Sequence, residues 1–124
     1  GLNAENHYVT AYDMYLIFNE ALKYDTVNEI ISMTSYDTVY TDKNGNEKTL
    51  SVKNTNQYLA GNVAAPDRVT VIGGKTGTTS AAGNCLILLA RDTSGNPYIA
   101  VILKSAERGI LYTEMNALLK QATS

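Results

Sequence analysis

The sequence predicts an α+β fold, in which an antiparallel sheet packs against one helix near the N-terminus and one at the C-terminus. Three stretches, at about 69–78, 85–91 and 98–104, have the β-branched and apolar composition of strands and are separated only by short polar turns. Apolar residues recur at helical spacing before and after this region. Strands joined by short turns pair antiparallel, because a parallel pair needs a longer crossover.

The first helix is expected after a short opening loop. Thr10 and Asp13 have the spacing of a capping box, with Asp in place of the usual Glu. Apolar residues then follow at helical spacing and form one face: Ala11, Met14, Tyr15, Phe18, Ala21 and Leu22. A second, short helix capped by Thr26 and Glu29 is expected to run to about Met33.

The next segment predicts a small, largely exposed two-stranded ribbon. Its strands are expected at Tyr36–Thr41 and Lys48–Lys53, where Tyr36, Thr38 and Tyr40 alternate with other residues. The pair Asn44-Gly45 between them is a strong hairpin signal, because both residues tolerate the positive φ angles of a tight turn.

The C-terminal part predicts the rest of the sheet and its cover. Cys85–Ala90 and Tyr98–Leu103 are apolar without alternation, which indicates a sheet covered on both faces. Ser105 with Glu107 is expected to start the last helix, and the N-terminal helix is short for covering the second face. The apolar stripe of the last helix is Leu111, Met115, Leu118, Leu119 and Ala122.

Composition excludes several classes of function. The 124 residues suit one domain, and 44% hydrophobic with 18% charged residues is typical of globular proteins. A net charge of -2 without a Lys/Arg cluster argues against nucleic-acid binding. The longest apolar runs, about six residues, are far shorter than the roughly 20 of a membrane span. Cys85, the only cysteine, permits no internal disulfide and is expected to be a small core residue.

The chemistry of the sequence concentrates in Gly73–Thr79, where one lysine and three threonines lie among three glycines. Glycine lets a bound group approach the backbone, and lysine and hydroxyl side chains favour an anionic oxygen. A phosphate loop is excluded, because it requires glycine where Val69 stands and a helix where a strand follows. The plain alternative is a glycine-rich hairpin with an incidental lysine.

Three stretches resemble one family in the right order. Gly74–Gly83 resembles the Lys-Thr-Gly region of the low-molecular-weight penicillin-binding proteins, the serine D-alanyl-D-alanine carboxypeptidases. Gly1-Leu2 followed by His7–Met14 resembles the family's Gly-Leu…Tyr-(Ser/Thr)-(Ser/Thr)-Ala-x-Asp segment, and Asn54–Leu59 its Asn-x-Asn-x-Leu-Leu stretch. The resemblance covers nearly the whole chain and implies an incomplete domain of the transpeptidase-like fold.

The family's nucleophile and base are not found here. The resemblance implies Ser-x-x-Lys and Ser-x-Asn motifs N-terminal to the Lys-Thr-Gly element, and the chain contains no Ser-x-x-Lys. Ser94-Gly95-Asn96 follows Lys75 and is interpreted as a turn. We therefore expect residues 1–124 to be the C-terminal part of a single transpeptidase-like catalytic domain, inactive by itself.

By resemblance, the site residues take specific roles. Lys75 supplies positive potential near the substrate carboxylate and the active-site serine, and the backbone N–H of Thr78 is one oxyanion donor. Thr76 contacts the carboxylate or a proton path, Gly77 keeps the strand edge open, and Thr79 is a further substrate-binding residue; strand surface is the alternative for Thr78 and Thr79.

One family feature is displaced. The family often carries an arginine in the first turn of the last helix that helps to hold the terminal carboxylate. That place falls at Leu111, one turn after Arg108, so Arg108 is a candidate substrate-binding residue whose substitution for the missing arginine stays open.

The implied parent enzyme removes the terminal D-Ala from peptidoglycan stem peptides ending in D-Ala-D-Ala and reacts with β-lactam antibiotics. It works outside the cytoplasm, in the cell envelope, and needs no metal or cofactor. The alternatives are a β-lactamase or transpeptidase of the same fold, and a non-catalytic domain that binds cell-wall peptide or a protein. Because 98–104 carries little that would protect an unpaired edge, self-association through that edge is also expected.

Overall fold

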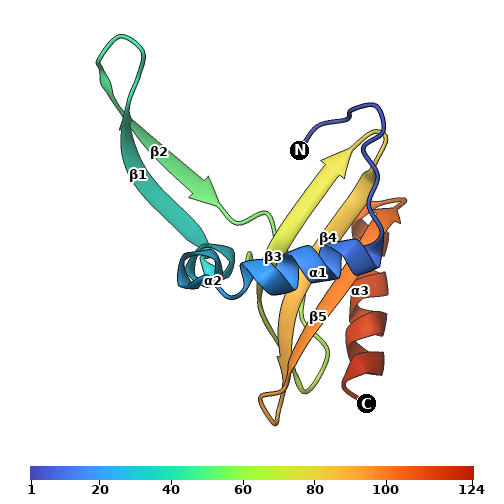
Figure 1. The fold of residues 1–124 in the computed structure, drawn as a ribbon. Helices are drawn as coiled ribbons and strands as arrows, with labels where there is room; N and C mark the ends of the chain where they lie inside the picture. The colour runs from blue at the N-terminus through green and yellow to red at the C-terminus, as the bar shows by residue number, and fades with distance from the viewer.

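A computed structural model describes residues 1–124 and has the predicted α+β architecture (Figure 1). Strands β3, β4 and β5 form one antiparallel sheet in that order, and β1 and β2 form a separate two-stranded ribbon. The three sheet strands expected from sequence are confirmed. In chain order the elements are α1 (Ala11–Ala21), α2 (Asp25–Ser32), β1 (Ser35–Thr41), β2 (Glu47–Lys53), β3 (Val69–Thr79), β4 (Gly83–Asp92), β5 (Pro97–Ser105) and α3 (Arg108–Ala122).

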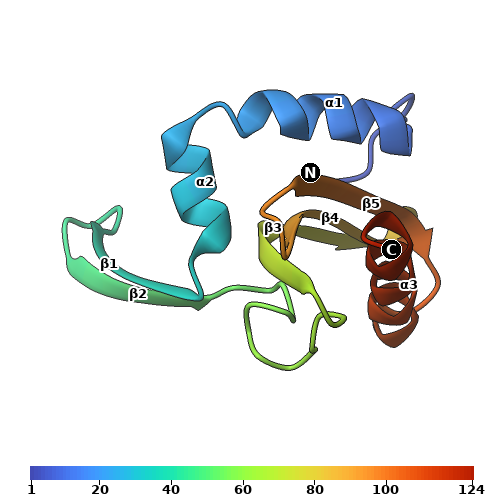
Figure 2. The same ribbon diagram turned by 90° about the horizontal axis from the view of Figure 1, so that it is seen from below.

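Helices cover both faces of the sheet, with α1 on one side and α3 on the other (Figure 2). Alternate residues of β4 point to opposite faces, so Leu86 and Leu88 join the α3 side and Ile87 and Leu89 join the α1 side. This double burial explains why the strand is apolar without alternation. The α3 side is the larger core, completed by α3 residues Leu111, Tyr112, Met115 and Leu119.

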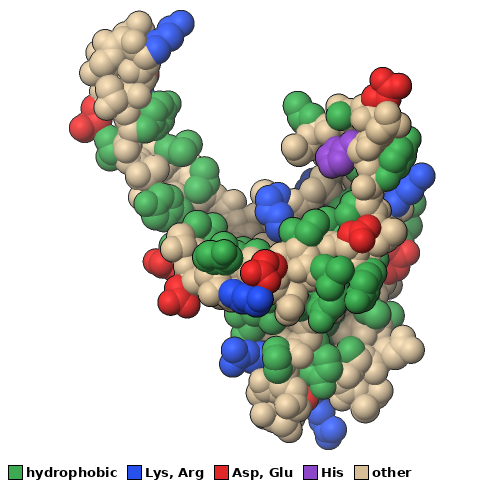
Figure 3. Space-filling view, viewed as in Figure 1, with side chains coloured by type: hydrophobic (Ala, Val, Ile, Leu, Met, Phe, Trp, Pro, Cys, Tyr) green, Lys and Arg blue, Asp and Glu red, His purple; other side chains and the backbone are tan.

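The α1 side is covered less completely. Among the α1 residues only Phe18 is buried there, and α2 adds Ile31 at the margin of the cluster. Large apolar side chains stay exposed on the outer surface of the same helices, including Tyr12 at 67%, Ile17 at 59% and Ile30 at 60%. Figure 3 shows hydrophobic side chains along α1, α2 and the ribbon on this face.

The N-termini of the helices agree only in part with those predicted from the sequence. The capping box of α1 is present: the Thr10 hydroxyl accepts from the Asp13 N–H at 3.0 Å, and the Asp13 carboxylate accepts from the Thr10 N–H at 2.8 Å. The bond from the Thr10 backbone lowers the pKa of Asp13. The second helix is also present, but its N-cap is Tyr24 without a side-chain cap, so the expected capping by Thr26 and Glu29 is wrong.

The start of α3 differs from the prediction as well. The N-cap is Glu107, again without a side-chain cap, while Ser105 is the last residue of β5. Ser105 is buried, and its hydroxyl donates to the carboxylate of Glu114, in the second turn of α3, at 2.8 Å. Its polar side chain therefore serves the strand–helix packing and not the helix cap.

Both hairpin turns with the pattern Asp-x-x-Gly-Asn have the same geometry. In the ribbon turn the Asp42 carboxylate accepts from the N–H groups of Asn44 and Asn46, and in the β4–β5 turn Asp92 accepts from Ser94 and Asn96. The glycine in each turn has a positive φ, 81° and 83° respectively. The interpretation of Ser94-Gly95-Asn96 as a turn is confirmed.

The ribbon is largely exposed, as expected: only Thr38 is half-buried, and neither strand has a buried residue. Cys85 differs from its expected place in the core and is only half-buried. Its cross-strand partner is Gly77, which has no side chain to cover it. None of the three helices is long and apolar enough to span a membrane.

Candidate active site

Strand β3 carries the Lys-Thr-Gly sequence and lies at one edge of the sheet, since only β4 pairs with it. The pairing is interrupted once, between Val71 and Gly73, where Ile72 is the extra residue of a bulge. Beyond the bulge the register is continuous from Gly73 to Thr79. The outer edge of this segment is free to pair with an extended chain.

The register divides the candidate residues between the two faces of the sheet. Lys75 and Gly77 lie opposite Ile87 and Cys85, on the face that α1 covers. Thr76 lies opposite Leu86, on the face that α3 covers, and Thr78 follows it on the same side. The candidate site is therefore an edge with a cation on one side and hydroxyl groups on the other.

Two glycines of β3 are required by packing within the chain. A Cβ on Gly73 would lie 2.4 Å from the Ile31 carbonyl oxygen at the end of α2. A Cβ on Gly74 would lie 2.1 Å from the Ile87 carbonyl oxygen and 2.9 Å from a Leu88 methyl group. Both glycines are buried. Here the absence of a side chain lets α2 and β4 approach β3.

Gly77 has no such structural reason. A Cβ there would meet nothing within 4 Å, the residue is exposed, and its φ lies outside the positive range that requires glycine. The open space beside Gly77 is what the sequence interpretation expects of a strand edge that a ligand approaches closely.

Lys75 and Thr79 have different surroundings on the α1 side. The Lys75 side chain is exposed, its ammonium donates to the Thr76 carbonyl oxygen, and no carboxylate neutralises it. The Thr79 hydroxyl donates to the Asn3 side chain at 2.8 Å and accepts from the Ala82 N–H at 3.0 Å. Thr79 therefore fixes the β3–β4 turn and the opening loop, while Lys75 stays available to an anion.

On the α3 side both threonine hydroxyls are in contact with other segments. The Thr76 and Thr55 hydroxyl oxygens lie 2.5 Å apart, and either can be the donor. The Thr78 hydroxyl donates to the side-chain oxygen of Asn84 at 3.4 Å. The Asn84 amide in turn donates to the carbonyl groups of Ser105 and Ala106, at 3.2 and 3.3 Å. This chain of contacts joins the edge of β3 to the segment just before α3.

Arg108 lies at the first position of α3 and lines a polar hollow of about 380 Å³. Amide and hydroxyl side chains surround it, from Gln57, Asn62, Tyr112, Thr113 and Asn116. None of the five β3 residues from Lys75 to Thr79 lines this hollow, and no ion pair involves Arg108. The structure therefore does not bring Arg108 into direct contact with Lys75.

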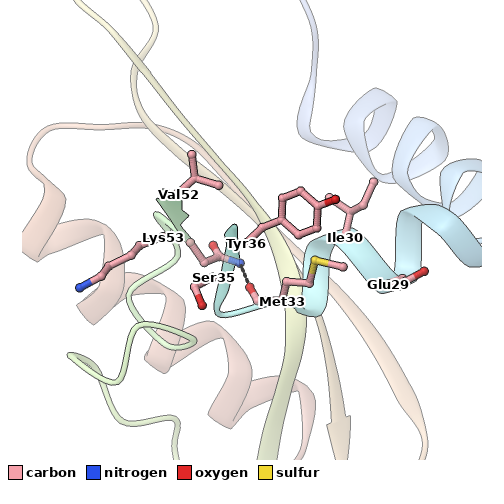
Figure 4. Close-up of a pocket in the computed structure, with 8 residues that line it drawn as sticks. Glu29, Ile30, Met33, Ser35, Tyr36, Val52 and Lys53 are labelled. Carbon is pink, nitrogen blue, oxygen red and sulfur yellow. Dashed lines mark hydrogen bonds between the residues drawn. The ribbon is translucent and has the colours of Figure 1, made fainter. Parts of the chain in front are cut away.

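A larger hollow, about 510 Å³, lies elsewhere, between the end of α2 and the base of the ribbon (Figure 4). Half of its lining is apolar, with Ile30, Met33, Tyr36 and Val52. No residue of β3 lines it, so size alone does not identify the site here. The exposed Lys75 cation, the threonine hydroxyls and the open edge at Gly77 make β3 the candidate site instead.

Sequence reasoning missed two residues of the candidate site. Thr55 lies in the stretch Asn54–Leu59 that carries part of the family resemblance, but no role was expected for it. Asn84 gave no signal, because its contact with Thr78 depends on the exact length of the β3–β4 turn.

The family assignment comes from the sequence as a whole. The family model described as D-alanyl-D-alanine carboxypeptidase, peptidase family S11, matches residues 1–107. The chain belongs to this family. The predicted resemblance is confirmed over most of the length, including all of the segments that carried it.

Solved structures agree with the family assignment. Two variants of the Streptomyces K15 DD-transpeptidase superpose with TM-scores of 0.79 and 0.74, at 26% and 27% sequence identity. The matched regions cover 97% and 94% of this chain, but only 43% and 42% of the two transpeptidase chains. The chain thus spans less than half the length of these relatives, and its fold is part of the transpeptidase-like domain. No curated protein sequence matches it.

Proposed function

We propose that this chain is the C-terminal part of a single transpeptidase-like catalytic domain in a longer serine D-alanyl-D-alanine carboxypeptidase. The enzyme is acylated by a peptidoglycan stem peptide ending in D-Ala-D-Ala, releases the terminal D-Ala and hydrolyses the acyl-enzyme. β-Lactam antibiotics acylate the same serine. Because its substrate is cell-wall peptide, the enzyme acts in the cell envelope, outside the cytoplasm.

The observation that supports this proposal most is the free edge of β3 at Lys75–Thr78. An extended peptide adds to an exposed strand edge through its main chain, and the open space at Gly77 leaves room for that approach. An unneutralised lysine next to the edge attracts the peptide's terminal carboxylate. Packing within the chain accounts for none of these three features.

Each candidate residue has a role in this proposal. Lys75 provides positive potential for the carboxylate and the serine, and the Thr76 hydroxyl donates to the carboxylate. The Thr78 N–H is one of two donors to the oxyanion, and losing one such donor typically lowers the rate by about 10²–10³-fold. Thr79 contributes by holding the β3–β4 turn beside the site.

Arg108 takes a supporting role. It lies on the α3 side with Thr76 and Thr78, in a polar hollow that an anion can enter. We assign it to the outer part of the substrate, since no contact links it to the Lys75 edge. Leu111, where the family often has arginine, is buried in the core and is not available to a substrate.

A transpeptidase outcome is the second candidate, because the structural neighbours are named DD-transpeptidases. The two outcomes differ only in whether water or an amine attacks the acyl-enzyme. Incubating the longer enzyme with a D-Ala-D-Ala peptide, with and without an acceptor amine, separates them by the product formed. Turnover of a chromogenic cephalosporin would instead favour a β-lactamase.

Covalent labelling tests the proposal itself. The 124-residue chain is expected to take up no fluorescent penicillin, whereas the longer enzyme is labelled at a serine outside these residues. Stable labelling of any serine in the short chain, located by mass spectrometry, would contradict the proposal that the nucleophile lies outside these residues. A longer protein without Ser-x-x-Lys that stays unlabelled would support a non-catalytic binding domain.

A further inference from the structure

The segment Asn54–Tyr58 is fixed to α2 and to α3, although the proposed function gives it no role. The Asn54 amide donates to the Met33 carbonyl oxygen at the end of α2, at 2.7 Å. The Gln57 N–H donates to the Tyr112 hydroxyl of α3 at 3.0 Å, and the Tyr58 hydroxyl donates to Asn116 at 2.8 Å. Burial, with a smaller effect of Tyr112, raises the pKa of Tyr58 to about 12.

The segment also bonds to itself. The Asn54 side chain accepts from the Asn56 N–H at 2.9 Å, and the Asn56 side chain accepts from the Tyr58 N–H at 3.1 Å. The Gln57 amide donates to the Thr55 carbonyl oxygen at 3.0 Å. Asn56 is fully buried. A loop held this closely fixes where the exposed Thr55 side chain lies.

Thr55 touches the candidate site at one point, through the 2.5 Å contact between its hydroxyl oxygen and that of Thr76. Each hydroxyl carries one proton, so only one of the two can donate in this pair. If Thr76 donates to an anionic substrate oxygen, the proton between the two threonines must come from Thr55. Bonds aligned in this way strengthen one another.

From this contact we infer that Thr55 is a positioning residue: its hydroxyl donates to Thr76 and holds the Thr76 proton toward the substrate carboxylate. The inference rests on the proposed function, because that function supplies the carboxylate. It gives the segment Asn54–Tyr58 a role, because this segment holds Thr55 against Thr76 of β3, twenty-one residues further along the chain.

The first test uses the 124-residue chain and needs no activity. Three-bond couplings measured by NMR report the side-chain rotamer of Thr76. Thr55→Val keeps the shape but removes the hydroxyl, and it should leave Thr76 averaging between rotamers. Thr55→Ser should restore the single rotamer, and Thr70→Val, an exposed site on the same strand, should change nothing. A single, unchanged Thr76 rotamer in Thr55→Val would overturn the inference.

The second test uses the longer enzyme and a pair of substrates, one with the terminal carboxylate and one with a carboxamide in its place. Thr55→Val should lower kcat/KM for the carboxylate by about three- to tenfold, the range of one hydrogen bond. It should leave the carboxamide unaffected, and Thr55→Ser should restore the loss. The double variant with Thr76→Val should be no slower than Thr76→Val alone.

An equal loss on both substrates, or additive losses in the double variant, contradicts the positioning role. A wild-type enzyme without activity on either substrate contradicts the proposed function instead. The rotamer measurement distinguishes these failures, because it decides the Thr55–Thr76 pairing without any turnover.

Discussion

The two halves of the glycine-rich run in β3 look alike in sequence and differ completely in surroundings. Gly73 and Gly74 are buried, and any side chain there would collide with the carbonyl groups of α2 and β4. From Lys75 onward most of the strand is exposed, and Gly77 faces open space. The difference teaches that this chain's own packing requires glycine in the first half, whereas it does not require the glycine in the second half.

A second contrast supports this division. The Lys75 ammonium has no acidic partner, whereas the molecule's one ion pair joins Glu20, near the end of α1, to Lys23, just after this helix. Thr76 and Thr78 use their hydroxyls to meet other segments of the chain, Thr55 and Asn84. The side chains of the exposed half of β3 are thus held by specific contacts although the core does not need them, which is typical of a binding or catalytic site.

The largest effect is expected at Gly74. In Gly74→Ala the new methyl group meets the Ile87 carbonyl oxygen at 2.1 Å, so β3 and β4 must separate. We expect a loss of about 3 kcal/mol in the free energy of unfolding, measured by urea denaturation. An unfolding midpoint equal to that of the wild type would contradict the packing role assigned to this half of the strand.

The reverse pattern is expected at Lys75. Lys75→Ala in the longer enzyme should lower the rate of acylation by penicillin well over tenfold, because the unneutralised cation next to the carboxylate is lost. The unfolding midpoint should stay near that of the wild type, since Lys75 is exposed. Unchanged acylation kinetics would remove Lys75 from the site.

Gly77 provides the sharpest comparison with Gly74, because the substitution is identical. Gly77→Ala has open space for its methyl group, so the free energy of unfolding should change by no more than about 0.5 kcal/mol. Acylation should nevertheless fall about tenfold, the equivalent of roughly 1.4 kcal/mol, because the methyl group crowds the approaching substrate. A variant that is both stable and fully active would show that the edge at Gly77 is not used.

The smallest effect concerns the opposite edge of the sheet. No strand pairs with the outer side of β5, and the run Ile99–Leu103 carries no charge or proline to protect it. We therefore predict that the isolated chain self-associates at high concentration, and that Val101→Lys weakens the association. Light scattering checks both, and a clean monomer for the wild type at every concentration tested contradicts the prediction.

The sequence by itself determined the features that depend on neighbouring residues. The capping box of Thr10 and Asp13 and the Asn44-Gly45 turn form within a few residues, so local chemistry predicts them. The apolar runs of β4 and β5 predicted a sheet covered on both faces, because the number of apolar residues already exceeds what one face needs. The family resemblance of Gly74–Gly83 likewise needed only the order of residues along the chain.

Tertiary structure alone decided which residues meet. The length of the β3–β4 turn sets the register from Gly73 to Thr79, and this register pairs Thr78 with Asn84 and places Lys75 beside Ile87, on the α1 face of the sheet. Thr55 reaches Thr76 only because α2 and α3 fix its loop from both sides. Such contacts join positions that are distant in sequence, so they follow from how the elements pack and not from the pattern of any one segment.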